Sequence, residues 1–318
     1  MTRQLAMLPI ILATSLGFVI STPSGQAQKL AGPHRPAVVP EGYVITPFGY
    51  FHPSCVRAVV SGDTVLADGR IQHADGTVDA EAPACGYPHY AASGEILTAG
   101  RTAPTISHSW IESGNSVNTT SSFGELTANW TVPPAPTTDD GQTVFLFPGM
   151  EDYALDETII QPVLGWNAGF FGTNWSIASW NCCPSGTANY STPVQVNAGD
   201  IIYGAIKSTC NPGVKSCSTW NITTEDQTTR QLTTLGKTPK KGQTFTWAQG
   251  GALEVYEIVK CSDYPPNNST TFSNLALYDY NFIQYSNPGW VLFNYSGGLV
   301  PQCNYDGAMG IKKLTLDY

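Results

Sequence analysis

Charged side chains are scarce in this sequence of 318 residues. Asp, Glu, Lys and Arg together make up 12% of the chain, and the net charge is −9. A surface of this kind has no basic patch with which to bind nucleic acid or anionic lipid. It also has few carboxylates in ion pairs, so little stability is lost when carboxylates are protonated. The composition argues against a nucleic-acid partner and is compatible with a secreted protein that tolerates acid.

Histidine is almost absent from the last two thirds of the chain. Four of the five histidines lie between residues 28 and 104, and only His108 remains between Thr105 and the C-terminus. A Ser-His-Asp or Cys-His site in this part would depend on His108 alone. Zinc is equally unsupported, because the sequence has no Cys-x-x-Cys pair and no histidine partner for one. We expect no metal and no cofactor, and predict that any acid–base group here is a carboxylate.

Long apolar runs are also missing, apart from one near the start. The run from Leu5 to Ile20 follows a basic residue and precedes small residues that end at Ala27. This order is typical of a secretory signal peptide, and we predict cleavage after Ala27. A membrane anchor is the alternative, but the run is short and no second one follows it. We therefore expect residues 1–27 to be removed and the protein to be secreted, without membrane contact after that cleavage.

The eight cysteines agree with an oxidising compartment, where an even number usually forms disulfides. Cys210 and Cys217 flank a short loop between two strand-like runs, so we expect them to pair. A bond between Cys55 and Cys85 would stay within the first third of the chain. The remaining cysteines would pair among themselves, in an order that the sequence does not fix: Cys182, Cys183, Cys261 and Cys303.

No window shows a sustained helical period, and from about Thr105 short apolar runs alternate with turn residues. Many strands without helices indicate an all-β fold, an antiparallel β-sandwich of the jelly-roll, concanavalin-like kind, over residues 105–318. The expected strands are Glu125–Val132, Gln142–Phe147, Glu157–Leu164, Trp175–Trp180, Asp200–Lys207, Ser218–Thr224, Gln231–Leu235, Thr244–Trp247, Ala252–Cys261, Ser269–Leu277, Trp290–Tyr295 and Lys312–Asp317.

Residues 28–104 differ from the rest of the chain, with many prolines and most of the histidines. Val65–Gln72 predicts a hairpin around the Asp68-Gly69 turn. We interpret this stretch as a small N-terminal extension closed by a disulfide. It is either a removable prosegment or a permanent subdomain, and the sequence leaves both open.

One apolar stretch, Gly250–Val259, carries two carboxylates, Glu254 and Glu257. Side chains alternate between the faces of a strand. Glu257 would share the core side with Leu253, whereas Glu254 would lie on the opposite face. A solvated carboxylate on an exposed sheet face is the simplest interpretation of Glu254.

A family resemblance changes that interpretation. From about Ser107 onward the chain resembles the eqolisin family of glutamic peptidases, secreted acid proteases with a β-sandwich fold. The resemblance covers about two thirds of the chain and rests on blocks in the family's order: Ser109-Trp110, Leu126–Pro133, Phe147–Asp152, Thr158–Val163, Val196–Ile202, Ala252–Val255 and Thr271–Asn274. It implies Gln161 and Glu254 as catalytic residues, and Phe147, Asp152 and Trp180 as substrate-binding residues. Neprosin-type glutamic peptidases look similar near Gln161 but have a second Glu there.

The chain also departs from the family pattern. Phe147 stands where the family has Trp, and Ser179 replaces a Glu. The strand that implies the catalytic carboxylate reads Glu-Val-Tyr-Glu, so Glu257 competes with Glu254 for that role. These changes put the shape of the substrate pocket, and activity itself, in question.

The resemblance implies a secreted endopeptidase that acts on polypeptides, and we expect it to be a monomer. Glu254 would take a proton from the attacking water, and the Gln161 amide would stabilise the oxyanion. The alternative is an inactive or carbohydrate-binding sandwich, because a fold does not fix a function. Exposed aromatics would bind the sugar in that case, and the candidates are Trp166, Trp175, Trp180 and Trp290.

Overall fold

The computed structural model describes residues 35–80, 85–97, 110–153, 158–183, 186–240, 243–294, 301 and 303–318. The expected signal peptide and His108 lie outside these residues. All described residues belong to one compact unit, Ala31–Tyr318. The N-terminal extension and the sandwich are therefore packed together.

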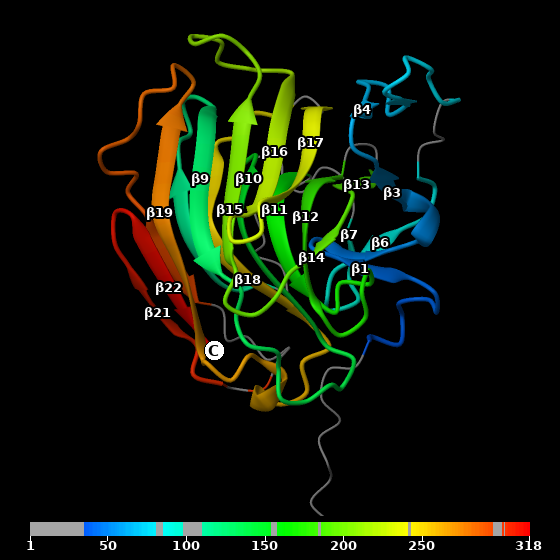
Figure 1. The fold of residues 1–318 in the computed structure, drawn as a ribbon, viewed down its shortest axis with the longest axis vertical. Coiled ribbons are helices and arrows are strands. Elements are labelled where there is room, and N and C mark those ends of the chain that lie inside the picture. Colours follow the sequence, from blue (N-terminus) through cyan, green and yellow to red (C-terminus); the bar gives the residue numbers. More distant parts are fainter. Residues whose placement is uncertain are drawn as a thin grey trace, which may run out of the picture. The chain divides into compact units, whose positions relative to one another are not determined.

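Two large sheets form the fold, which confirms the predicted antiparallel β-sandwich (Figure 1). No α-helix occurs in the described part of the chain. One sheet has the strand order β20-β8-β18-β10-β11-β12-β13-β3, with β14 paired to β12. Its strands are β3 (Val56–Val59), β8 (Trp110–Val117), β10 (Thr143–Glu151), β11 (Ile159–Trp166), β12 (Trp175–Cys182), β13 (Ala188–Ser191), β14 (Val194–Gln195), β18 (Trp247–Tyr256) and β20 (Val291–Asn294).

The second sheet has seven strands in the order β17-β16-β15-β9-β19-β22-β21. They are β9 (Phe123–Thr131), β15 (Ile201–Ser208), β16 (Thr219–Asp226), β17 (Gln231–Pro239), β19 (Ser269–Asp279), β21 (Asp306–Met309) and β22 (Lys313–Asp317). Most predicted strands are found within a few residues of the expected bounds. Thr244–Trp247 and Ala252–Cys261 are the exceptions, because part of each belongs to the single strand β18.

Three clusters of buried side chains define the layers. Two of them draw residues from both sheets and fill the space between them, as Leu253 does with Trp130 and Met150 does with Trp220. The third covers the other side of the nine-stranded sheet, and we call this side the outer face. Here Phe147 and Trp180 are buried by residues of the N-terminal extension and not by the second sheet.

The extension forms a four-stranded sheet and a separate hairpin. The sheet order is β1-β2-β6-β7, and β4 pairs with β5. These strands are β1 (Val44–Thr46), β2 (Gly49–Phe51), β4 (Thr64–Val65), β5 (Ile71–Gln72), β6 (His89–Tyr90) and β7 (Ile96–Leu97). The β4–β5 pair is the predicted hairpin around Asp68-Gly69. β3 joins the large sheet by pairing in parallel with β13, so the extension continues that sheet at its edge.

Strand β18 has the alternation predicted for its second half. Leu253 and Val255 lie between the sheets, whereas Ala252 and Tyr256 lie on the outer face with Glu254 between them in sequence. Glu257 departs from the prediction. The strand ends before Glu257, whose φ of 59° is left-handed, so its side chain does not join the core.

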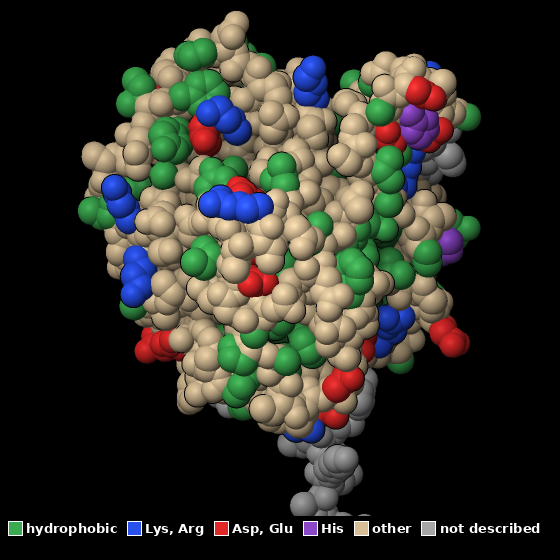
Figure 2. All heavy atoms as spheres, in the orientation of Figure 1, with side chains coloured by type: hydrophobic (Ala, Val, Ile, Leu, Met, Phe, Trp, Pro, Cys, Tyr) green, Lys and Arg blue, Asp and Glu red, His purple; other side chains and the backbone are tan. Residues whose placement is uncertain are grey.

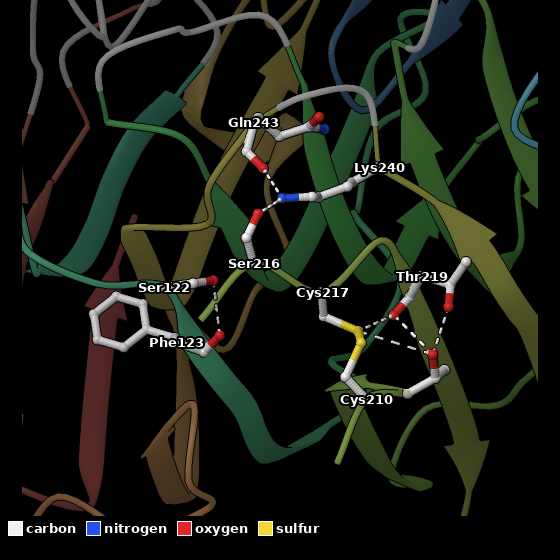
Figure 3. The surroundings of a disulfide bond; sticks show 9 residues. Ser122, Phe123, Cys210, Ser216, Cys217, Thr219, Lys240 and Gln243 are labelled. Carbon is white, nitrogen blue, oxygen red and sulfur yellow. Dashed lines mark hydrogen bonds between the residues drawn. A yellow bond between two sulfur atoms is a disulfide. The ribbon is translucent and has the colours of Figure 1, made fainter. Parts of the chain in front are cut away.

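All eight cysteines form disulfides. Cys210–Cys217 and Cys55–Cys85 confirm the two pairings expected from the sequence. The other four pair as Cys182–Cys183 and Cys261–Cys303. Figure 3 shows the Cys210–Cys217 bond, which closes the loop between β15 and β16.

The same loop is held at a second point. The Nζ of Lys240 donates to Ser216 Oγ at 2.5 Å and to the Gln243 carbonyl at 2.7 Å, as Figure 3 shows.

The surface carries few charges, as the composition implied. Figure 2 shows few charged side chains on the visible face, some of them beside a side chain of opposite charge, and no basic patch. No helix of the described residues is long and apolar enough to cross a membrane. No group of His, Cys, Asp and Glu suited to a metal ion occurs in the described ranges.

Candidate functional site

A row of residues crosses the outer face at the level of Gly149 in β10. Gly149 pairs with Gln249 of β18, which pairs with Asn115 of β8. On the other side, the β10–β11 register runs from Leu146↔Leu164 to Met150↔Ile160, which sets Gly149 opposite Gln161. Gln161 in turn pairs with Trp180 of β12. Polar amides therefore meet in one row of a face on which apolar side chains such as Phe147 and Trp180 are also buried.

Gln161 is fully buried in this row. Its Nε2 donates to the carbonyl of Pro47 at 2.7 Å, and its Oε1 has no hydrogen-bond partner among the described residues. Pro47 lies in the turn between β1 and β2 of the extension. Gln161, the catalytic candidate that the resemblance implies, thus binds a backbone carbonyl of the chain's own N-terminal extension.

Gln249 is the second amide of the row and is also fully buried. In the part of the chain that the structure describes, neither its Nε2 nor its Oε1 has a hydrogen-bond partner. Its Oε1 lies 2.8 Å from the place that a Cβ on Gly149 would take. The missing side chain of Gly149 therefore leaves the room that the Gln249 amide fills.

Glu151 lies on the same face, in the neighbouring row. It ends β10 and pairs with Ile159 of β11 and with Trp247 of β18. Ile159 is two residues from Gln161 in β11, and Trp247 is two residues from Gln249 in β18. Both glutamines are therefore diagonal neighbours of Glu151. Diagonal neighbours in antiparallel sheets have Cβ atoms about 7–8 Å apart or somewhat less. The Glu151 side chain is 1% exposed.

Glu254 is fully buried on the outer face and is held by hydrogen bonds. The Nε1 of Trp110 donates to its Oε2 at 2.9 Å, and the hydroxyl of Tyr256 donates to its Oε1 at 2.5 Å. Tyr50 of the extension packs edge-on against Tyr256, with 5.3 Å between ring centres. The extension thus packs on the tyrosine that holds this carboxylate, and it also contacts Gln161.

The register nevertheless separates Glu254 from Gln161. Glu254 pairs with Phe145, four positions along β10 from Gly149. Four residues of a strand span about 14 Å, and two strand spacings add about 10 Å across the sheet. A separation of this size is too large for the two side chains to hold one water molecule between them. Their shared role on one water stays a prediction, and this arrangement does not favour it.

Glu257, the competing carboxylate, takes part in contacts with the extension. Its Oε1 accepts from the Tyr50 hydroxyl at 3.3 Å and lies 3.4 Å from the Nε of Arg35. Burial, followed by the charge of Glu257, raises the pKa of Tyr50. These contacts attach the extension to the end of β18.

The three predicted substrate-binding residues have different places. Phe147 is buried on the outer face against Trp110, with 5.7 Å between ring centres. Trp180 stacks on Tyr190 at 5.0 Å, next to Gln161. Asp152 lies beyond the end of β10 and accepts from the Thr244 backbone N–H at 2.8 Å. Phe147 and Trp180 border the row of amides, whereas Asp152 braces a loop.

A cavity of about 490 Å³ adjoins this row, and extension and sandwich residues line it together. Phe170, Trp180 and Tyr190 form an aromatic stack on one side of it. Arg35 and Glu257 supply charge on its lining. Of the tryptophans proposed as sugar platforms, only Trp180 lines the cavity. Trp166 and Trp175 are core residues, and Trp290 packs on the buried clusters.

Sequence reasoning missed Gln249 and Glu151. Gln249 is five positions before Glu254, and simple alternation puts such a pair on opposite faces. A bulge at Gly250 and Gly251 restores Gln249 to the outer face. Glu151 belongs to the Phe147–Asp152 block, from which the resemblance implies Phe147 and Asp152 and not Glu151. The same alternation, counted from Phe147, would have selected Glu151.

Comparison with known proteins gives a distant likeness. No protein-family model matches the chain, and no curated protein matches it. Among solved structures, scytalido-glutamic peptidase with a transition-state analog inhibitor is similar over 66% of this chain and 98% of that chain, with 13% identity and a TM-score of 0.49.

Two further structures are of the same kind. SCP-B, a member of the eqolisin family in complex with the tripeptide Ala-Ile-His, has 14% identity and a TM-score of 0.47 over 66% of this chain and 98% of that chain. Aspergilloglutamic peptidase from Aspergillus niger has 16% identity and a TM-score of 0.38 over 55% of this chain and 98% of that chain.

Proposed function

We propose that this protein is a secreted acid endopeptidase that binds polypeptides across the outer face of the nine-stranded sheet. The observation that carries the proposal is the hydrogen bond from Gln161 Nε2 to the Pro47 carbonyl, at 2.7 Å. A peptidase needs a donor for the carbonyl oxygen that becomes an oxyanion. Gln161 already donates to a peptide carbonyl at this place, and its amide does not titrate, so it can donate in acid.

The surroundings of Gln161 support a functional role. An unpaired amide atom buried away from water costs about 1–3 kcal/mol. Gln161 and Gln249 both have such atoms in one row of the sheet. A fold that keeps unpaired amides next to one another in a buried row gains by binding a polar group there. A peptide backbone supplies carbonyls and N–H groups of the required kind.

We further propose that the N-terminal extension is an inhibitory prosegment. Its Pro47 carbonyl occupies the Gln161 amide, and its Tyr50 packs on Tyr256, the residue that donates to Glu254. Its own disulfide, Cys55–Cys85, closes within the extension, and none of the four disulfides joins it to the sandwich. A single cut between residues 97 and 110 would therefore leave it attached by non-covalent contacts alone.

The base in this reaction would be a carboxylate, as histidine is scarce in the sandwich. Glu254 is the residue that the sequence resemblance implies, and Glu151 is the carboxylate nearest to Gln161 by register. An ionised carboxylate can take a proton from water and return it to the leaving amine. It works in acid only as long as it stays ionised.

The test is incubation of the purified full-length protein at about pH 3, followed by mass spectrometry. Self-cleavage between residues 97 and 110 should come first, and digestion of an added unfolded protein should follow. Chelators and reagents for serine or cysteine should not inhibit it. Gln161→Ala should lower kcat by about 100-fold to 1,000-fold, the usual effect of losing one oxyanion donor. An absence of any cleavage between about pH 2 and 7 would reject the proposal.

A second candidate function is sugar binding without catalysis. The cavity next to Trp180 favours it, because stacked aromatic rings border an open space with polar neighbours. Saturable binding on a glycan array, lost in Trp180→Ala, together with no peptide cleavage, would support this function over the first.

A further inference from the structure

We propose that Glu151, and not Glu254, is the general base that works with Gln161. The inference rests on the proposed peptidase function and names the residue that removes the proton. It follows from the register of three neighbouring strands, β18, β10 and β11.

The geometry groups Glu151 with both buried amides. Gln161 and Gln249 face each other across Gly149, which has no side chain to separate them. Glu151 is the next outer-face residue of β10, diagonal to both. With Cβ atoms about 7–8 Å apart, a carboxylate and an amide can hold one water molecule between their polar atoms. Glu254 is four positions along β10 and two strands across from Gln161, beyond that reach.

The hydrogen-bonding state of the amides points to the same place. Three amide atoms are buried without a partner in the described ranges: Gln161 Oε1, Gln249 Nε2 and Gln249 Oε1. These atoms offer one donor group and two acceptors around Gly149, where a water molecule needs two to four polar partners. By contrast, both carboxylate oxygens of Glu254 accept bonds from neighbouring rings. Glu254 is thus fixed in its surroundings, and we assign it the role of holding Trp110 and Tyr256.

The proposed step keeps atoms and charges in balance. A scissile carbonyl takes the place of the Pro47 carbonyl at Gln161 Nε2. Water, oriented by Gln249, attacks the carbonyl carbon while Glu151 takes one of its protons, and the oxyanion accepts from Gln161. The C–N bond then breaks, and protonated Glu151 gives its proton to the leaving amine. The products are a carboxylic acid and an amine, and Glu151 returns to its ionised form.

The experiment compares Glu151→Gln with Glu254→Gln in the full-length chain. Immobilised wild-type enzyme processes each variant in acid and is then removed, so that self-processing is not required. Cleavage of an internally quenched peptide gives kcat and KM, and peptide binding is followed by tryptophan fluorescence. Glu151→Gln should lower kcat by about 100-fold to 10,000-fold, the usual contribution of a general base. Its KM and peptide binding should stay near the wild-type values, and Glu254→Gln should lower kcat by less than about tenfold.

Glu151→Asp serves as the conservative variant and guards against misfolding of Glu151→Gln. It should keep a measurable kcat, lowered at least tenfold, with the acidic limb of the pH profile displaced. An unchanged kcat and pH profile in Glu151→Asp would overturn the inference. An inactive Glu254→Gln together with an active Glu151→Gln would also overturn the inference, while the proposed peptidase function would stand. An inactive wild-type protein would remove the proposed function, and the role of Glu151 with it.

Discussion

The Nε2 of Gln161 and the carbonyl of Pro47 are 2.7 Å apart, although 114 residues separate them in sequence. This bond joins the centre of the nine-stranded sheet to the β1–β2 turn of the extension. The extension therefore reaches the outer face at the same point where we place the reacting carbonyl. Whatever loosens the extension should also uncover the site.

His89 should make the extension weaker in acid. It stacks on Phe51, with 4.8 Å between ring centres, and burial lowers its pKa to about 4. An opened extension would return His89 to a pKa near 6.5, so the open form binds the proton more readily. Stability of the closed form is therefore lost as the pH falls from about 6.5 to 4, by up to about 3 kcal/mol in total.

The matched variant is His89→Phe, which keeps the stacked ring and cannot titrate. Hydrogen exchange of β1 and β2 amides should speed up between pH 6.5 and 4 in the wild type, and much less in His89→Phe. Self-processing in acid should be slower in the variant. Equal acid sensitivity of the two proteins would show that His89 does not control the opening.

Glu112 should make the whole sandwich more stable in acid than at neutral pH. It is fully buried in β8, and burial, followed by the charges of Asp317 and Asp306, raises its pKa to about 9. The folded state then holds a proton that the unfolded state releases above about pH 4.5. The stabilising contribution is complete below that pH and falls by about 1.4 kcal/mol per pH unit until about pH 9.

Glu112→Gln tests this by replacing the protonated acid with a neutral side chain of the same shape. Urea unfolding at several pH values should show a flatter pH dependence for the variant, which should be the more stable of the two at pH 8. If the free energy of unfolding changed with pH equally in the wild type and in Glu112→Gln, the raised pKa of Glu112 would be contradicted.

The alternation of apolar residues was sufficient to predict most strands and the sandwich, because one side of each strand faces the core. A disulfide across a short loop, such as Cys210–Cys217, could also be predicted from the sequence. Strand β8 was missed because Ser113 and Asn115 place polar groups on its outer face. Polar residues at alternate positions look like a loop in the sequence, and the contact that holds one of them, from the Trp247 Nε1 to Asn115 Oδ1 at 3.0 Å, joins residues far apart in the chain.

The site was harder to predict because it depends on register and on one bulge. Sequence reasoning selected Gln161 and placed Glu254 on the correct face. It had no means of knowing that Gly250 and Gly251 form a bulge, which changes the phase of β18. The residue level with Gln161 is therefore Gln249. Contacts of the extension, such as that of Pro47 with Gln161, join residues far apart in sequence and could not be predicted from a local sequence pattern.

Gln249→Met should stabilise the protein and lower its activity. The amide of Gln249 is buried without partners, which costs about 1–3 kcal/mol, and Met has a similar length without those polar atoms. We expect a higher free energy of unfolding, by about 1–2 kcal/mol, in urea titrations. The same change should lower kcat, because the water would lose an amide that orients it. A variant that is both less stable and fully active would contradict the role of this amide.

Gly149→Ala should disturb the site while leaving the fold in place. A Cβ on Gly149 would come 2.8 Å from Gln249 Oε1 and 3.0 Å from the Cδ1 of Ile159. Both atoms are at the ends of side chains, so they can move aside at modest cost, and the Gln249 amide would be pushed out of its row. Gly236→Ala is the control, because Gly236 also lies in a strand but has open space around its Cβ position. We expect the thermal unfolding temperatures of both variants to stay close to that of the wild type. The kcat should fall at least tenfold in Gly149→Ala and stay unchanged in Gly236→Ala. A normal kcat in Gly149→Ala would mean that the space beside Gly149 takes no part in catalysis.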